Sequence, residues 1–142
     1  MKKTELTKEE LQGVKSESKR YYDVVYKNLE ANPKPMYSDE SIQDMEDLLG
    51  SFEKFENDDE EKTNIANVMG IYLGECIIKK YGGKWIYDEK DNLVVKVNEN
   101  FISNPIVKVY KRLTYGEEDS VYDFYMITDK LKDKIPPIYK SK

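Results

Sequence analysis

A helical segment that ends at two glycines constrains the fold more than any other part of the sequence. From Ile65 to Tyr81, an advance of about 100° per residue places apolar side chains around most of the circumference. These side chains include Met69, Ile71, Leu73, Cys76, Ile77 and Ile78. Gly82 and Gly83 follow, and glycine readily adopts the left-handed conformation that closes a helix. We therefore predict a central helix, surrounded by the rest of the chain.

The segment after the two glycines is typical of a β-hairpin. Residues 84–87 and 93–97 are rich in β-branched and aromatic side chains, and the polar residues 88–92 separate them. A two-stranded hairpin is marginally stable alone, so it must pack against helices or gain a third strand, for which residues 100–103 are the candidate.

Two helices are predicted before the central one. Thr7 and Glu10 form a capping-box pattern that begins a helix over residues 8–31, which the prolines that follow end. Ser38 is a good N-cap for a second helix, in which Gly50 could cause a kink or an early end. The charged residues 55–62 are then expected to form a loop.

The C-terminal part predicts one or two more helices. Asn104 as N-cap and Pro105 at the first helical position begin a fourth helix that Gly116 ends. Residues 121–132 follow a cap-like Ser120 and predict a fifth helix, although their β-branched and aromatic content leaves a strand as the alternative.

Together these elements predict an α+β fold that is mainly helical, with three N-terminal helices, a β-hairpin after the third, and one or two C-terminal helices. A length of 142 residues suits one domain over residues 1–142, with flexible ends at residues 1–6 and 133–142.

The composition excludes several kinds of chemistry. The chain has no histidine and one cysteine, which removes Ser-His-Asp and Cys-His machinery, histidine-based zinc sites and an internal disulfide. Cys76 lies on the apolar arc of the central helix, where we expect it to be buried and inert. We therefore expect no enzyme activity, no cofactor and no metal.

No apolar run follows the two N-terminal lysines, and no 18 consecutive residues are apolar. A signal peptide and a membrane-spanning helix both need such runs. We expect a cytoplasmic protein with no membrane partner.

Negative charge is concentrated just before the central helix. Residues 38–62 contain eleven acidic residues against two lysines, a net charge of −9, whereas the whole chain carries −5. Such runs usually keep a protein soluble, but they can also steer a basic partner. The partner-binding candidates are Asp44, Asp47, Asp58, Asp59, Glu60 and Glu61.

An alternative site lies on the central helix. Glu75 and Lys79 have the spacing of an ordinary surface ion pair, but with Tyr72 and Trp85 they could instead line a ligand-binding or hydrolytic cleft. The cleft gains support only if Glu75 is buried without Lys79. Lys108, Lys111 and Arg112 match no phosphate-binding loop, and the acidic chain disfavours nucleic acid.

The spacing of several short patterns resembles a small, uncharacterised bacterial domain. These patterns are Gly70-Ile-Tyr-Leu-Gly-Glu75, Gly82-Gly83-Lys-Trp85, Asn104-Pro105, Lys111-Arg112-Leu113, Gly116-Glu-Glu-Asp-Ser120 and Phe124-Tyr125. The resemblance covers residues 64–125 and implies no particular activity, although some similar proteins look like immunity proteins that neutralise antibacterial toxins. The acidic segment lies outside it. We therefore expect a non-enzymatic binding protein, such as an immunity-type inhibitor with a basic, toxin-like partner. The alternative is a small-molecule-binding domain or hydrolase with a cleft near Glu75 and Trp85.

Overall fold

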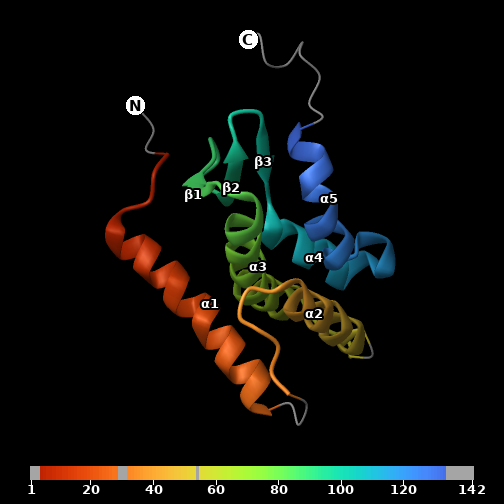
Figure 1. Cartoon of the computed structure of the whole chain (residues 1–142). Coiled ribbons are helices and arrows are strands. Elements are labelled where there is room, and N and C mark those ends of the chain that lie inside the picture. The colour runs from red at the N-terminus through yellow and green to blue at the C-terminus, as the bar shows by residue number, and fades with distance from the viewer. Residues whose placement is uncertain (1–3, 29–31, 54, 134–142) are drawn as a thin grey trace.

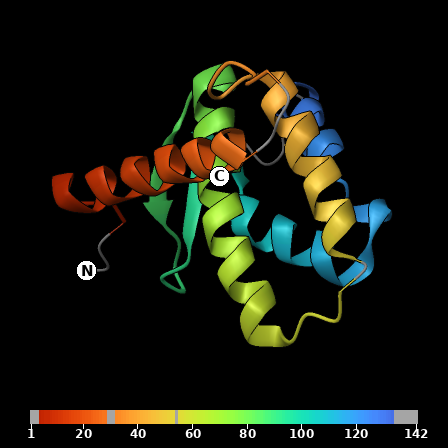
Figure 2. The same ribbon diagram turned by 90° about the horizontal axis from the view of Figure 1, so that it is seen from below.

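The computed structural model describes residues 4–28, 32–53 and 55–133 and has a mainly helical α+β fold, as predicted. In Figure 1, α3 runs through the middle of the molecule, and Figure 2 shows α1 crossing it. The elements are α1 (Lys8–Asn28), α2 (Asp39–Phe52), α3 (Asp59–Tyr81), β1 (Lys84–Tyr87), β2 (Leu93–Asn98), β3 (Phe101–Ser103), α4 (Pro105–Tyr115), the short 3-10 helix η1 (Glu117–Asp119) and α5 (Val121–Asp133).

The centre of α3 is buried, as its apolar circumference predicts. Leu73 and Cys76 are fully shielded from solvent, and the core around them takes side chains from both ends of the chain. Leu49 of α2, Val95 of β2 and Val109 of α4 belong to this one core. The helix therefore joins the N-terminal helices to the sheet and to α4.

Helix α3 begins earlier than predicted. The Asp58 carboxylate accepts a hydrogen bond from the backbone N–H of Glu61 (2.8 Å), and the Glu61 side chain accepts one from the N–H of Asp58 (3.1 Å). This capping box, with an acidic first turn that complements the helix dipole, begins the helix at Asp59. The prediction of a loop over residues 55–62 is therefore wrong for residues 59–62.

The first two helices begin where the sequence predicts. Thr7 and Glu10 make both hydrogen bonds of a capping box, and Ser38 accepts a hydrogen bond from the N–H of Ser41. Gly50 does not end α2, which continues to Phe52. The predicted end of the first helix, at residues 29–31, lies outside the described residues.

The three strands form one antiparallel sheet in the order β1-β2-β3. Trp85 pairs with Val95, and Val95 pairs with Ser103, so the predicted hairpin is confirmed and the expected third strand is present. The N–H of Tyr87 donates to the carbonyl of Thr4 (2.8 Å), next to a bridge between Glu5 and Ile86. The predicted flexible end at residues 1–6 thus includes a segment that pairs with β1.

Two glycines let other elements approach α3 closely. A Cβ on Gly70 would lie 2.5 Å from the Cα of Ile106 in α4, and a Cβ on Gly74 would lie 2.2 Å from Cη2 of Trp85. Real Cβ atoms do not approach other atoms so closely. The small residues of α3 therefore serve tight packing against α4 and the tryptophan.

Residues 121–133 form a helix, which decides between the two predictions for this segment. Ser120 accepts a hydrogen bond from the N–H of Asp123 (3.1 Å), and the Tyr125 hydroxyl donates to Asp39 at the start of α2 (2.7 Å). Helix α5 thus packs beside α2. Of the predicted flexible end at residues 133–142, residues 134–142 lie outside the described part of the chain.

Candidate functional site

Two acidic residues in the first half of α2, Asp39 and Asp44, are neutralised within the molecule. Asp44 accepts hydrogen bonds from the Tyr26 hydroxyl (2.7 Å) and from Lys34 Nζ (3.3 Å). Asp39 pairs with Lys80 Nζ (2.8 Å). Asp44, one of the predicted partner-binding residues, therefore helps to hold α2 against α1 and the connecting segment.

The acidic residues that begin α3 have mixed roles. Asp58 and Glu61 cap the helix, and Asp59 accepts a hydrogen bond from the Tyr110 hydroxyl of α4. Glu60 is exposed on the same turn. Figure 2 shows the start of α3 near the end of α2, so these four residues lie at the opposite end of α2 from its N-terminal carboxylates.

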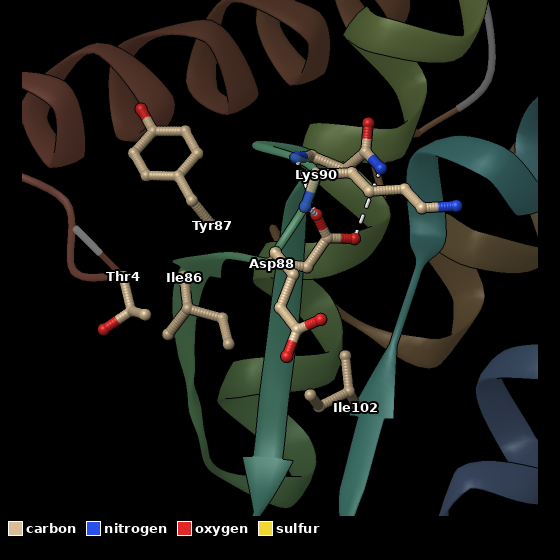
Figure 3. Close-up of a pocket in the computed structure, with 8 residues that line it drawn as sticks. Thr4, Ile86, Tyr87, Asp88, Lys90 and Ile102 are labelled. Carbon is tan, nitrogen blue, oxygen red and sulfur yellow. Dashed lines mark hydrogen bonds between the residues drawn. The ribbon is translucent and has the colours of Figure 1, made fainter. Parts of the chain in front are cut away.

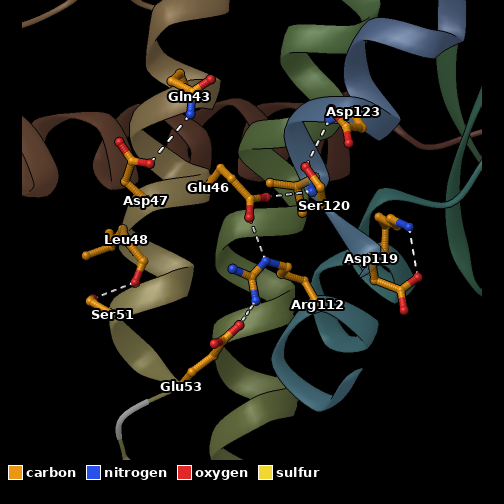
Figure 4. Close-up of polar contacts among 12 residues, drawn as sticks. Gln43, Glu46, Asp47, Leu48, Ser51, Glu53, Arg112, Asp119, Ser120 and Asp123 are labelled. Atoms are coloured by element: carbon orange, nitrogen blue, oxygen red, sulfur yellow. Dashed lines mark hydrogen bonds and ion pairs between the residues drawn. The ribbon is translucent and has the colours of Figure 1, made fainter. Parts of the chain in front are cut away.

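A buried arginine links α2 to α4. Arg112 is 2% exposed, and its Nε donates to Glu46 (2.7 Å) while its guanidinium also contacts Glu53. The second oxygen of Glu46 accepts a hydrogen bond from the N–H of Val121, the first residue of α5 (2.8 Å). In Figure 4 the two carboxylates point from α2 towards Arg112. Both carboxylates and the guanidinium are thus paired where three helices meet.

Two hollows between α2 and α4 share Glu53, and Arg112 lines the first of them. The first, of about 470 Å³, is lined by Glu46, Asp47, Gly50, Glu53, Arg112, Glu117 and Ser120. The second, of about 460 Å³, is lined by Phe52, Glu53, Phe55, Glu56, Asn57, Lys62, Leu113, Thr114, Tyr115 and Gly116. We call the two hollows together the α2–α4 groove.

The α2–α4 groove combines negative charge with exposed aromatic rings. Its lining has five carboxylates against two cations, a net charge of −3. Phe55 and Tyr115 are 67% and 61% exposed, although aromatic rings gain much from burial. Asp47 lies in the first hollow, and the residues next to the Asp58–Glu61 turn, Asn57 and Lys62, line the second.

Arg112 is a structural residue, a role that the sequence did not predict. Lys108, Lys111 and Arg112 were considered together for phosphate contacts, but Lys108 pairs with Asp119 (2.9 Å) and Arg112 pairs with two carboxylates. Arg112 lies three residues after the buried Val109, on the same face of α4. That position is the sequence signal for its burial.

Glu75 is buried without Lys79, so the predicted surface ion pair is wrong. Glu75 is 8% exposed, and its Oε2 accepts a hydrogen bond from Nε1 of Trp85 (3.0 Å). Lys79 contacts other groups instead. Its Nζ lies 3.4 Å from the carbonyl oxygen of Met36 and above the ring of Tyr37. The partner of Glu75 is therefore not Lys79 but the indole of Trp85, which lies against Gly74.

A small pocket opens beside Glu75 and Trp85, between α1, α3 and β1. It has a volume of about 190 Å³ and is lined by Leu11, Val14, Lys15, Glu75, Ile78, Gly83, Lys84 and Trp85. Lys15 Nζ lies 3.8 Å from Oε1 of Glu75. The pocket therefore has apolar walls, one buried carboxylate and two lysines.

The other residues of the α3 site are not available for chemistry. Tyr72 is fully buried, and its hydroxyl donates to Ser41 Oγ (2.8 Å) and accepts from the N–H of Tyr37 (2.8 Å). It does not line the pocket beside Trp85. Burial raises the pKa of the Cys76 thiol well above its usual range, so the thiol is not a ready nucleophile. The expectation that Cys76 is buried is confirmed.

A depression of about 580 Å³ lies over the hairpin and is shown in Figure 3. Thr4, Ile86, Tyr87 and Ile102 line it together with the loop between β1 and β2. Its carboxylate, Asp88, accepts hydrogen bonds from the backbone N–H groups of Lys90 (2.8 Å) and Asn92 (2.9 Å). Asp88 thus organises the turn itself.

Within residues 4–28, 32–53 and 55–133, no group of three or more acidic or cysteine side chains could hold a metal ion. No helix in the same ranges is long and apolar enough to cross a membrane. No protein-family model matches the chain, and neither a curated protein nor a solved structure matches it.

Proposed function

We propose that the protein is a non-enzymatic binding protein whose α2–α4 groove takes a basic segment of a partner protein. The observation that carries this proposal is the pairing of unneutralised carboxylates with two exposed aromatic rings in one groove. An immunity-type inhibitor of a basic toxin is the form of this function that the resemblance in the sequence favours.

The charge of the groove supports a basic partner. Arg112 is already paired with Glu46 and Glu53, so it offers no open site for an anion. Asp47 and Glu117 are exposed at the edge of the first hollow, and among the described residues neither makes an ion pair. A lysine or arginine of the partner would find uncompensated negative charge there, which speeds encounter and fixes orientation.

The aromatic side chains supply the contact area that charge alone lacks. Exposed carboxylates contribute little affinity individually, whereas buried aromatic anchors dominate many protein interfaces. Phe55 and Tyr115 lie in the same hollow, beside Glu56. Covering these rings on binding would provide the apolar centre, with the carboxylates as a polar rim.

Affinity capture from the source cells with charge-reversed variants tests this function. Asp47→Lys and Glu117→Lys change the groove without touching the Arg112 network. Asp23→Lys, on the exposed side of α1, is the matched control with the same change in charge. The expected result is a basic protein that the wild type and the control retain, that both groove variants lose, and whose binding weakens about tenfold or more between 50 and 300 mM salt.

Binding that survives both groove variants, or that does not depend on salt, would contradict the proposal. Glu60→Lys separates the groove from the acidic segment as a whole, because Glu60 carries charge near the groove without lining it. We expect this variant to lower the affinity less than Asp47→Lys.

A further inference from the structure

Glu75 is a buried carboxylate whose hydrogen-bonding capacity is only partly used. A carboxylate can accept about four hydrogen bonds. Trp85 supplies one to Oε2, while the Lys15 ammonium lies 3.8 Å from Oε1, outside hydrogen-bond range. The Lys15 side chain is also 65% exposed, so it screens the carboxylate without closing the pocket. Oε1 therefore has unused acceptor capacity, and Glu75 is one of the residues that line the pocket.

Several walls of the pocket are apolar. Leu11 and Val14 of α1 and Ile78 of α3 line it beside the indole. The indole lies against Gly74 and is 3% exposed. A cavity with apolar walls and a few fixed polar groups is the usual form of a small-molecule site. Its volume of about 190 Å³ admits only a small compound.

We propose that this pocket binds a free α-amino acid with a short aliphatic side chain. The ligand's ammonium group donates to Oε1 of Glu75, and its carboxylate pairs with Lys15 at the mouth, because Lys84 is already paired with Glu5 (2.8 Å). The side chain of the ligand packs among Leu11, Val14 and Ile78.

The arrangement of charges selects a zwitterion over a simple cation or anion. A plain amine would pair with Glu75 but would meet repulsion from Lys15, and a plain carboxylate would meet repulsion from Glu75. An α-amino acid carries both charges on one carbon, so it can present its ammonium to Oε1 of Glu75 and its carboxylate to the neighbouring Nζ of Lys15. This inference is independent of the α2–α4 groove.

Fluorescence titration of the intact protein tests the proposal, because Trp85 is the only tryptophan and contacts Glu75 directly. The probe is L-valine, and the controls are its two fragments, isobutylamine and 3-methylbutanoate. The expected result is a saturable change in tryptophan emission with L-valine and a response at least about tenfold weaker with either fragment. Glu75→Gln should weaken L-valine binding by a similar factor, whereas Lys79→Ala should not.

Lys15→Ala gives a second test that leaves the buried carboxylate in place. Removing this exposed lysine takes away a partner of the ligand's carboxylate and the cation that repels a plain amine. We expect L-valine to bind several-fold more weakly and isobutylamine more tightly. The proposal is overturned if wild-type emission shows no saturable change up to about 10 mM L-valine, or if both fragments bind as well as L-valine.

Discussion

Arg112 and Glu75 are both buried charges, but the molecule partners them to different degrees. Arg112 is in contact with two carboxylates, one of which also holds the first N–H of α5. Glu75 has one neutral donor, Trp85, and a loosely placed exposed lysine. A buried charge is costly unless it is paired. The first site is therefore part of the architecture, whereas the second retains capacity for a ligand.

The surroundings of the two residues agree with this difference. Arg112 lies where α2, α4 and α5 meet, and it lines the first hollow of the α2–α4 groove beside Glu53, which the two hollows share. Glu75 faces a small pocket directly. We infer that Arg112 fixes the shape of the groove that we propose as the partner site, while Glu75 is itself a contact residue.

Arg112→Ala should have the largest effect on stability. It leaves Glu46 and Glu53 without their cation, and breaking a buried pair on one side typically costs about 3–5 kcal/mol. We expect about 3 kcal/mol here, because Glu53 is partly exposed. Urea unfolding measures the change. Lys111→Ala, at the exposed neighbouring position, should change the free energy of unfolding by less than about 0.5 kcal/mol. Equal losses in the two variants would contradict the structural role of the buried Arg112 pairs.

Gly74→Ala should have the next largest effect, because it forces the indole that partners Glu75 out of place. The added methyl would lie 2.2 Å from Cη2 of Trp85, and overpacking of this kind costs about 1–3 kcal/mol. Gly13→Ala in α1 is the matched control, since a Cβ there meets nothing within 4 Å. The control should stabilise the helix by about 0.5–1 kcal/mol. Thermal unfolding of both variants shows which one is destabilised and which one is stabilised. A Gly74→Ala protein as stable as the wild type would contradict the close packing of Trp85 against Gly74.

Glu75→Gln should cost less than about 1 kcal/mol, since the amide oxygen can still accept the hydrogen bond from Trp85. A loss this small would distinguish Glu75 from Arg112, because it would show that the charge of Glu75 contributes little to the stability of the fold. Urea unfolding followed by tryptophan fluorescence measures it. A loss as large as that of Arg112→Ala would assign Glu75 to the architecture instead.

The smallest effect concerns a surface pair, Asp39 and Lys80. The hydrogen bond from Lys80, with a second from Tyr125, lowers the pKa of Asp39 below its ordinary value of 3.8. A lowered folded pKa means that the pair contributes fully above pH 3.8 and that its contribution is lost as the pH falls through the lower folded value. Because the pair is partly exposed at the surface, we expect only a few tenths of a kcal/mol.

Asp39→Asn isolates this contribution. Unfolding at pH 6 and pH 3 should show a smaller acid loss for the variant than for the wild type. An identical acid loss in both proteins would show that Asp39 does not contribute to the pH dependence.

The sequence predicted most of the fold because its local signals agree with one another. The Thr7, Ser38 and Asn104 caps and the glycines after Tyr81 mark real boundaries. The early start of α3 was also encoded, since Asp58 and Glu61 have capping-box spacing, but the surrounding charge run favoured a loop. Local patterns thus predict where elements begin and end.

The candidate sites could be predicted only in part. Glu75 and Trp85 were singled out together, but their hydrogen bond depends on the turn at the two glycines bringing β1 back along α3. The pairing of Arg112 with Glu46 joins residues 66 positions apart, which no local spacing encodes. Asp47 was a candidate and lines the groove, whereas the aromatic side chains Phe55 and Tyr115 were not considered.

Site-specific photocrosslinking tests the proposed groove most directly. The photoreactive residue p-benzoylphenylalanine replaces Tyr115 in one protein and Val107, exposed on the same helix but outside the groove, in another. We predict that irradiation in the source cells joins a basic protein to position 115, that Asp47→Lys abolishes the adduct, and that position 107 gives none. The same adducts at both positions, or an adduct at position 115 that Asp47→Lys leaves unchanged, would contradict the assignment of the α2–α4 groove as the partner site.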